Sequence, residues 1–558
     1  MGAPHGSSCE AVKFGSFSLA TLSVISYDSF MKTTTLSINC VHGSSGRSAF
    51  LCVSALLCCV IISPIAQAVS PVPDGGCRYG NTAEGENALF SRTTAPYDTA
   101  IGLDTTQLQL PKNNPLWHKR FNGPGNNLDL GQAVAVSHDS QKVFVTGISE
   151  GLGPSYYTTV SYDAATGRKL WSHIYNGSEC TDAAVAVAVS PDNNTVFVTG
   201  SSGCLGLEDY ATVAYDATTG TELWASRYDG PTHDPDEAFA LALSLDGTKV
   251  FVTGRSFGKI GEGRDFATVA YSAIDGQELW VSRYDGPAHG EDESNDEAYS
   301  IAVSTDGEKL FVTGSSGGIG SDSDYATIAY KAAYGSELWV QRYNGPGNAA
   351  DFPQALVLSA NGGRMFVTGY SYSANSFSDY ATIAYDAATG LRLWLRRYDD
   401  PINGFDFAYA LALSPDATKL FVTGSCDESD TGTDFVTLAY DAATGERLWL
   451  RRYNGPANNS DSPAALGVSP DGEQVFVTGL SSGVASPDFP FDYATIAYRT
   501  SNGHSLWLDR HNGSGNRSDV PADLAVSPDG SRVFVTGSSD GITSGTDYLT
   551  LAYSTTPP

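Results

Sequence analysis

A recurring aspartate is the first feature of this sequence that could do chemistry, because a ring of carboxylates could hold a metal ion. It opens the same strand-like pattern at Asp209, Asp265, Asp324, Asp379, Asp434, Asp492 and Asp547. An arginine stands eighteen residues after each of the first six, at Arg227, Arg283, Arg342, Arg397, Arg452 and Arg510. In one further copy Tyr156 and Ile174 replace both residues together. Since positions with this spacing face each other across a hairpin, we predict structural ion pairs.

A second aspartate ends the loop that leads into each copy of a short apolar strand. These residues are Asp129, Asp182, Asp236, Asp296, Asp351, Asp406, Asp461 and Asp519. Aspartates at loop ends often accept hydrogen bonds from backbone N–H groups. Alternatively, the carboxylates hold a cation or a cationic ligand at the mouth of a central channel, and such oxygen ligands suit Ca²⁺. The sequence is compatible with both interpretations.

One long acidic loop is the best single candidate for a metal site. It carries Glu291, Asp292, Glu293 and Asp296. Asp292 and Asp296 alternate with Ser294, but the loop lacks the glycine and the distal glutamate of an EF-hand. A solvated acidic loop without a ligand is the other interpretation.

Evidence for catalysis is sparse in the sequence. We find no serine-nucleophile elbow, no H-E-x-x-H motif and no Cys/His zinc spacing, so no catalytic or cofactor-binding residue is assigned. The net charge of −30 argues against a nucleic-acid partner, because such a surface repels a phosphate backbone.

These residues lie on a repeated unit of short strands. In one copy, Asp379 to Tyr398, two strand-like segments flank a turn at residues 386–390. Phe-Val-Thr-Gly recurs eight times, and all eight tryptophans occupy one position of the unit, at Trp117, Trp171, Trp224, Trp280, Trp339, Trp394, Trp449 and Trp507. A period of about 56 residues with four short strands is typical of a propeller blade. We expect each tryptophan to dock between blades.

The number of strands predicts how the ring closes. Residues 116–121 match the fourth strand of the unit but precede the first complete copy, and the last copy ends at Tyr553 without a fourth strand. We therefore predict an all-β, eight-bladed β-propeller of four-stranded antiparallel blades, with the N-terminal strand completing the last blade. Arg120 occupies the arginine position of that strand, so we expect it to pair with Asp547.

Three segments are predicted along the chain. Residues 1–68 contain an apolar run at 49–62 and an Ala66-Gln67-Ala68 cleavage signal, so we interpret them as a leader with a signal peptide. Met31 is an alternative start, and an uncleaved membrane anchor is the rival interpretation. Residues 69–113 are predicted to be a flexible linker, and residues 114–558 the propeller. We expect a secreted or extracellular protein, periplasmic if bacterial, without stable membrane insertion after cleavage.

The cysteines and sequons fit secretion. Cys180 and Cys204 flank neighbouring antiparallel strands, and we predict a disulfide between them. Cys77 and Cys426 are the pair that remains after cleavage. Five N-x-S/T sequons predict a glycoprotein if the source is eukaryotic, at Asn176, Asn193, Asn458, Asn512 and Asn516.

A repeat pattern, A-x-D-x-x-T-G-x-x-x-W, resembles the tryptophan-docking repeat of quinoprotein (PQQ-like) propellers. It stands intact at residues 214–224, 384–394 and 439–449. The longer string DYATIAYDAATG…LW..RYNGP also resembles the SBBP repeats of secreted bacterial propellers. The resemblance covers residues 116–553 and implies binding and scaffolding as often as catalysis. A PQQ dehydrogenase would, by resemblance, want a vicinal disulfide, but Cys58 and Cys59 lie in the leader, so we do not expect PQQ.

The function predicted from these features is binding. We expect a monomeric binding or scaffold module for a small molecule, a glycan or a protein, with its ligand site on the face that carries the acidic loops. Ca²⁺ is the one cofactor that the acids suggest. The alternative is an enzyme seated in the channel, either a quinoprotein-like dehydrogenase or a Ca²⁺-dependent hydrolase or lyase.

Overall fold

A computed structural model describes residues 110–151, 153–177, 180–204, 206–258, 263–288, 295–373, 377–400, 404–428, 432–483, 491–515 and 517–556. It also describes a parallel pair of short strands, β1 (Thr82–Glu84) and β2 (Thr99–Ile101), within the predicted linker. The predicted leader lies outside the described residues. The chain divides into two units, Met1–Pro71 and Val72–Pro558, and all described elements belong to the second. No helix in the described part of the chain is long and apolar enough to cross a membrane.

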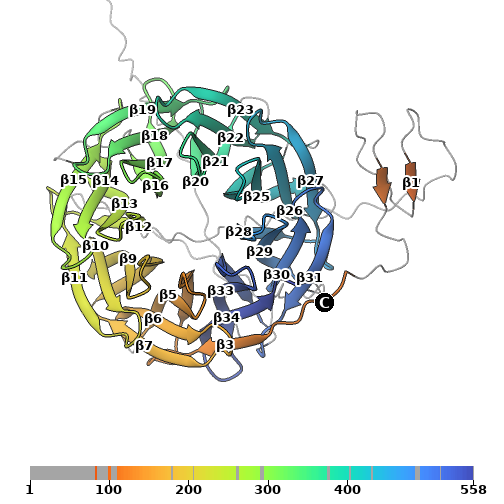
Figure 1. Cartoon of the computed structure of the whole chain (residues 1–558), viewed down its shortest axis with the longest axis horizontal. Helices are drawn as coiled ribbons and strands as arrows, with labels where there is room; N and C mark the ends of the chain where they lie inside the picture. The colour runs from red at the N-terminus through yellow and green to blue at the C-terminus, as the bar shows by residue number, and fades with distance from the viewer. Residues whose placement is uncertain are drawn as a thin grey trace, which may run out of the picture. The chain divides into compact units, whose positions relative to one another are not determined.

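Strands β3 to β34 form eight blades around a common axis (Figure 1). The innermost strands are β4 (Asp129–Val136), β8 (Thr181–Val189), β12 (Asp236–Leu243), β16 (Glu297–Val303), β20 (Asp351–Leu358), β24 (Asp406–Leu413), β28 (Asp461–Val468) and β32 (Asp519–Val526). The second strands are β5 (Lys142–Glu150), β9 (Thr195–Cys204), β13 (Lys249–Phe257), β17 (Lys309–Gly317), β21 (Arg364–Tyr372), β25 (Lys419–Glu428), β29 (Gln474–Ser482) and β33 (Arg532–Asp540).

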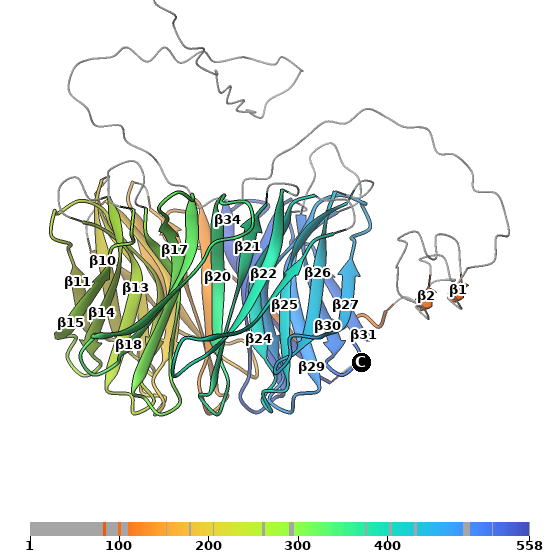
Figure 2. The ribbon, with the colours of Figure 1, turned by 90° about the horizontal axis from the view of Figure 1, so that it is seen from above.

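The outer half of each blade has the same order. The third strands are β6 (Ser155–Asp163), β10 (Leu207–Asp216), β14 (Arg264–Ser272), β18 (Ser323–Lys331), β22 (Ser378–Asp386), β26 (Gly432–Asp441), β30 (Phe491–Arg499) and β34 (Thr546–Ser554). The outermost strands are β7 (Lys169–Tyr175), β11 (Glu222–Tyr228), β15 (Glu278–Tyr284), β19 (Glu337–Tyr343), β23 (Arg392–Tyr398), β27 (Arg447–Tyr453), β31 (Ser505–His511) and β3 (Trp117–Phe121). Figure 2 shows the blades from the side, with their strands running roughly along the axis of the ring. Blades are numbered below from one, which contains β4 to β7, to eight, which contains β32 to β34 and β3.

The second and third strands of each blade are buried on both faces, which explains their runs of apolar and β-branched residues. The threonine that recurs in the middle of both strands is satisfied by a hydrogen bond inside the sheet. Thr368 on β21 and Thr382 on β22 share a hydrogen bond of 2.8 Å between their hydroxyl oxygens, and the other blades repeat this contact. The turn to the outermost strand ends at a glycine with positive φ, such as Gly390 at 74°, a conformation that favours glycine.

Each tryptophan of the outermost strands packs against the next blade. The ring of Trp339 lies against Gly390, where a Cβ would come within 2.8 Å of it. The indole N–H of Trp394 donates to the carbonyl of Ala442 at 3.2 Å. A buried tyrosine hydroxyl, that of Tyr380, donates to the carbonyl of Val436 across the same interface. These contacts join successive blades.

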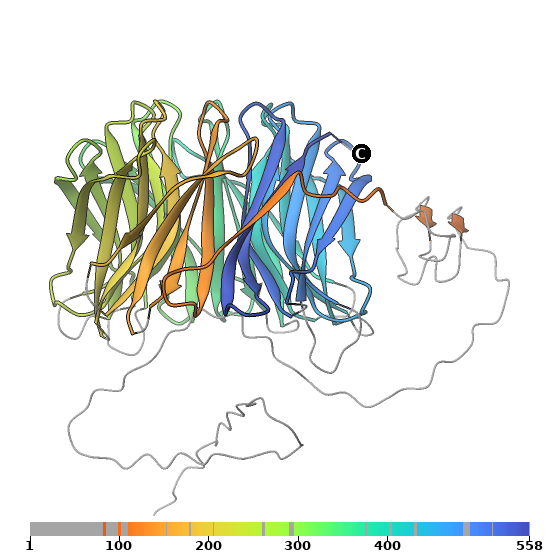
Figure 3. The same cartoon turned by 90° about the horizontal axis from the view of Figure 1, so that it is seen from below.

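The ring closes through the N-terminal strand (Figure 3). Strand β3 pairs antiparallel with β34, placing Trp117 opposite Ala552 and Phe121 opposite Tyr548. The Tyr548 hydroxyl donates to the carbonyl of Thr158 in blade one at 3.1 Å. The predicted eight-bladed propeller, completed by its own first strand, is therefore confirmed.

Candidate functional site

The third-strand aspartates meet the outermost-strand arginines within their own blades. The nitrogen–oxygen distances are 2.9 Å for Asp209–Arg227, 2.8 Å for Asp265–Arg283, 2.9 Å for Asp324–Arg342, 2.5 Å for Asp379–Arg397 and 2.8 Å for Asp492–Arg510. The arginine also holds the end of the second strand. In blade four, Arg342 donates to the hydroxyl of Ser316 at 2.6 Å and to its carbonyl at 2.8 Å. These contacts give the aspartates a structural role in holding three strands together.

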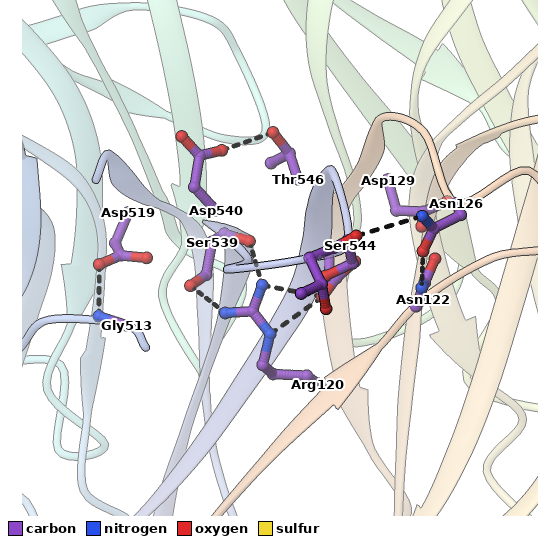
Figure 4. A network of polar contacts seen from close by, with 12 residues as sticks. Arg120, Asn122, Asn126, Asp129, Gly513, Asp519, Ser539, Asp540, Ser544 and Thr546 are labelled. Atoms are coloured by element: carbon purple, nitrogen blue, oxygen red, sulfur yellow. Dashed lines mark hydrogen bonds and ion pairs between the residues drawn. The ribbon is translucent and has the colours of Figure 1, made fainter. Parts of the chain in front are cut away.

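The same arrangement spans the ends of the chain (Figure 4). Arg120 on β3 pairs with Asp547 on β34 at 2.8 Å. It also donates to the hydroxyl of Ser539 at 2.5 Å and to its carbonyl at 2.6 Å. The N-terminal strand therefore reproduces the contacts of the outermost strands of blades two, three, four, five and seven, although 427 residues separate the two partners of the ion pair.

Blade six departs from this arrangement. Arg452 lies 3.9 Å from Asp434 and makes closer contacts with Asp400 and Glu428. Cys426 occupies the position that serine holds in the other blades, so the arginine loses its hydroxyl partner there. Asp400 replaces the loop glycine of the other blades and supplies the new carboxylate. The two substitutions together explain the displacement of Arg452.

The second ring of aspartates is buried. All eight carboxylates, at Asp129, Asp182, Asp236, Asp296, Asp351, Asp406, Asp461 and Asp519, are 0% exposed. They accept backbone hydrogen bonds from the preceding loop, as Asp351 does from Gly345 at 2.6 Å. In blade five the glycine avoids a clash, because a Cβ at Gly345 would lie 2.2 Å from the hydroxyl of Ser371 and 2.6 Å from Asp351. This geometry matches the loop-satisfying interpretation and places these acids beneath the surface.

Burial raises the pKa of most of these carboxyl groups. Desolvation raises the pKa of Asp236, Asp296, Asp351 and Asp519 to about 6, and that of Asp406 to about 7, although hydrogen bonds to the carboxylates counteract it. The pKa values of these groups therefore lie close to neutral pH. A cation bound beside them would lower the pKa and favour the ionised form.

Three acidic triads lie between neighbouring blades. They are Asp209–Asp229–Asp236, Asp265–Asp285–Asp296 and Asp379–Asp399–Asp406, and each offers ligand atoms within 4.8 Å of one another. The middle residue comes from the loop before the innermost strand, where other blades have Asn344 or Asn454. The triads fit a divalent cation in charge and ligand type. The Oδ1 atoms of Asp236 and Asp406 have no hydrogen-bond donor among the described residues, but the same is true of Asp129, Asp351 and Asp519 outside the triads.

The acidic loop can be placed only in part. Glu291, Asp292 and Glu293 lie outside the described residues. Asp296 accepts the backbone N–H groups of Gly286 at 2.6 Å and Gly317 at 3.0 Å. This residue is thus a buried member of the second ring and of one triad.

The cysteines that the structure describes have two different states. Cys180 and Cys204 form the predicted disulfide, with 5.0 Å between their Cα atoms. Cys426 is a free thiol, 0% exposed, and burial raises its pKa well above the ordinary value. Its predicted partner, Cys77, lies outside the described residues.

A group of aromatic side chains on the inner strands was missed by the sequence analysis. We call it the aromatic arc and define it as Phe239, Tyr299, Phe352, Tyr370, Phe407 and Tyr409. All six are partly exposed and lie near the ends of the inner strands where the second-ring aspartates stand. At the positions of Phe352 and Tyr370, blade seven has Ser462 and Leu480. A comparison of equivalent positions between blades, instead of within one strand, would have revealed the arc.

The arc consists of two groups of ring contacts, one across blades three and four and one across blades five and six. Phe239 contacts Tyr299 with 6.0 Å between ring centroids. Tyr370 packs on Phe352 at 5.2 Å and, edge-on, against Phe407 in the next blade at 4.8 Å. Such tilted and edge-on pairs are favourable aromatic contacts.

A neutral group of charges adjoins the arc. Arg255, 5% exposed, bonds Glu237 at 2.6 Å in its own blade and contacts Glu297 of blade four. Arg264 pairs with Glu297 at 3.2 Å. The Arg255 guanidinium also lies 5.5 Å from the ring centroid of Phe239. Two arginines therefore balance two glutamates, and one of them already occupies an aromatic face.

Comparison with known proteins agrees with the fold. The sequence model of the family described as outer membrane protein assembly factor BamB matches residues 106–327 and 265–541. No curated protein sequence matches the chain.

Solved structures are similar at low sequence identity. Sqt1 of Chaetomium thermophilum, solved with the N-terminus of ribosomal protein L10, has a TM-score of 0.52 at 13% identity, covering 79% of this chain and 100% of that one. BamB of Moraxella catarrhalis has a TM-score of 0.42 at 14% identity, covering 79% and 99%. Quinohemoprotein alcohol dehydrogenase of Comamonas testosteroni has a TM-score of 0.45 at 13% identity, covering 79% and 76%. This similarity concerns the propeller fold alone.

Proposed function

This chain belongs to the PQQ-like propeller family described by the outer membrane protein assembly factor BamB, and within that family we propose that it is a secreted binding propeller. Its ligand face is the end of the ring at which the innermost strands begin. The observation that carries this proposal is that the repeated residues and the aromatic arc have different surroundings. The repeated polar residues are engaged inside the blades, whereas the partly exposed aromatic arc interrupts the repeat on one side of the axis.

A binding role accounts for the arc better than catalysis does. Catalysis at this face would require a titratable group held within reach of a bound substrate. The titratable groups beside the arc are instead paired, as in the Arg255–Glu237 contact, or buried against backbone N–H groups, as in Asp351. An enzyme seated at the axis remains the competing proposal.

One set of measurements on the purified protein separates the two. We expect an absorbance spectrum without a quinone band and no turnover of alcohols with an artificial electron acceptor. A bound quinone present in stoichiometric amount, or alcohol oxidation, would overturn the binding assignment in favour of a dehydrogenase.

We also propose that Ca²⁺ occupies the acidic triads as a structural ion. The grouping of three carboxylates, with ligand atoms within 4.8 Å of one another, supports this. Metal analysis and Ca²⁺ titration of the metal-free protein test it. Asp229→Asn and Asp399→Asn copy the asparagine that other blades carry, so each should remove one site. Unchanged Ca²⁺ stoichiometry in both variants would reject the triads as ligands.

A further inference from the structure

The aromatic arc breaks the symmetry of a molecule that otherwise repeats its residues closely. On the innermost strands, Phe352 and Phe407 follow the buried aspartate directly, while the same position holds Ser462 in blade seven and Val520 in blade eight. Partly exposed aromatic side chains contribute less to folding than fully buried ones, so their concentration on blades three to six requires another explanation.

We propose that the aromatic arc is a binding site for a neutral oligosaccharide, with successive sugar rings stacked on the aromatic side chains of blades five and six. This inference rests on the proposed binding function and names its ligand class. Two sets of contacts, one aromatic and one polar, support it.

The aromatic contacts provide a row of similar surfaces. Phe405 directly precedes β24, and Phe407 and Tyr409 follow at alternate positions within it. The ring planes of Phe405 and Phe407 are 6° apart with centroids separated by 5.8 Å, and those of Phe407 and Tyr409 are 20° apart with centroids separated by 6.4 Å. Phe377, 58% exposed, extends the row by packing on Phe405 at 4.6 Å. A row of this kind suits a chain of rings, each with an apolar C–H face.

The polar contacts at the blade-three end of the arc favour an uncharged ligand there. Glu237 and Glu297 are neutralised by Arg255 and Arg264, so these four residues leave no unbalanced charge at that end. A quaternary ammonium ligand would find the face of Phe239 already occupied by the guanidinium of Arg255. Tyrosine hydroxyls and carboxylate oxygens can still bond sugar hydroxyls, because both accept more than one hydrogen bond.

The test uses the full secreted protein and a panel of soluble probes in isothermal titration calorimetry. The probes are cellohexaose, xylohexaose and mannohexaose as neutral glycans, with a proline-rich peptide and choline as alternatives. We expect at least one hexasaccharide to bind and its affinity to fall more than tenfold in Phe407→Ala and in Tyr370→Ala. The matched control Leu480→Ala, at the position in blade seven that corresponds to Tyr370, should bind as the parent does.

Each outcome decides the proposal. The eight tryptophans all lie at blade interfaces, so unchanged tryptophan emission shows that a variant retains its fold. Binding of no hexasaccharide, binding of the peptide or choline alone, or equal loss in the Leu480→Ala control would overturn the glycan assignment. None of these outcomes would show a bound quinone or alcohol oxidation, so failure here is distinguishable from failure of the binding function.

Discussion

The closing seam and the aromatic arc on blades three to six use polar and aromatic residues in opposite ways. The seam comprises strand β3 within blade eight and the boundary of blade eight with blade one. At the seam, Arg120, Tyr548 and Asp523 each bond a residue about 390 or more positions away in the sequence. On the arc, Phe407 and Tyr370 contact each other and remain partly exposed. The seam therefore holds the ring together, and the arc leaves its surface available to a ligand.

Removing the seam strand should have the largest effect. Deletion of residues 114–122 removes β3, exposes the edge of β34 and breaks the Arg120–Asp547 pair. We expect loss of soluble monomer, measured by size-exclusion chromatography with light scattering. A truncated protein that stays monomeric and melts at the parent temperature would show that closure does not depend on this strand.

Removal of the disulfide should have the next largest effect on stability. Cys180→Ser with Cys204→Ser frees a loop closed over a separation of 24 residues, and we expect a loss of roughly 3 kcal/mol in the free energy of unfolding, measured by denaturant titration. Peptide mapping of the unreduced parent provides the control. Two free thiols in that map would show that the bond is absent.

A single, partly buried acid at the seam should contribute less to the free energy of unfolding than the disulfide. Asp523 accepts the backbone N–H of Val134 at 2.9 Å across the seam. Asp523→Ala leaves that donor unpaired, and we expect a loss of about 1–3 kcal/mol in the free energy of unfolding. The matched change Ser300→Ala removes the corresponding hydroxyl contact to Leu356 between blades four and five. If the two variants lose the same free energy of unfolding, the seam contributes no more to stability than the boundary between blades four and five.

Stability should decline as pH rises from about 4 to about 7. Burial raises the pKa of Asp523 and Asp519 to about 6 and that of Asp406 to about 7, so the folded state holds these protons more tightly than the unfolded state, whose carboxyls titrate near 4. Stabilisation from these groups is complete below the unfolded pKa and is lost as pH rises through the folded pKa. Metal-free protein should melt several degrees higher at pH 5 than at pH 8, with a weaker dependence in Asp523→Asn. A melting temperature that rises over this interval would contradict the assignment.

A change at Phe377, which lies outside the arc and extends the row of rings through Phe405, should affect stability least. Phe377 is 58% exposed, and Phe377→Ser should alter the free energy of unfolding by about 0.5 kcal/mol or less. The same substitution should weaken hexasaccharide binding, which calorimetry measures. Destabilisation comparable to that of Asp523→Ala would instead make this part of the arc structural.

Much of the fold could be predicted because the same sequence unit recurs eight times. The unmatched strand at Arg120 and the unmatched Asp547 could be assigned to each other once the blades were counted. The arc was not predicted because Phe407 and Tyr409, considered within one strand, have the alternation of an ordinary half-buried strand. The displacement of Arg452 was not predicted either, because it depends on Cys426 and Asp400 together. These two substitutions are separate in the sequence and come close only in the folded structure.

Hydroxyl-radical footprinting with and without the bound hexasaccharide tests the central claim most directly, because it reports side-chain protection over the whole ring in one experiment. We predict protection of Tyr370, Phe405 and Phe407, with no change at Leu480 or Val520. Protection confined to blades seven, eight, one and two would contradict the division between a structural repeat and a binding arc.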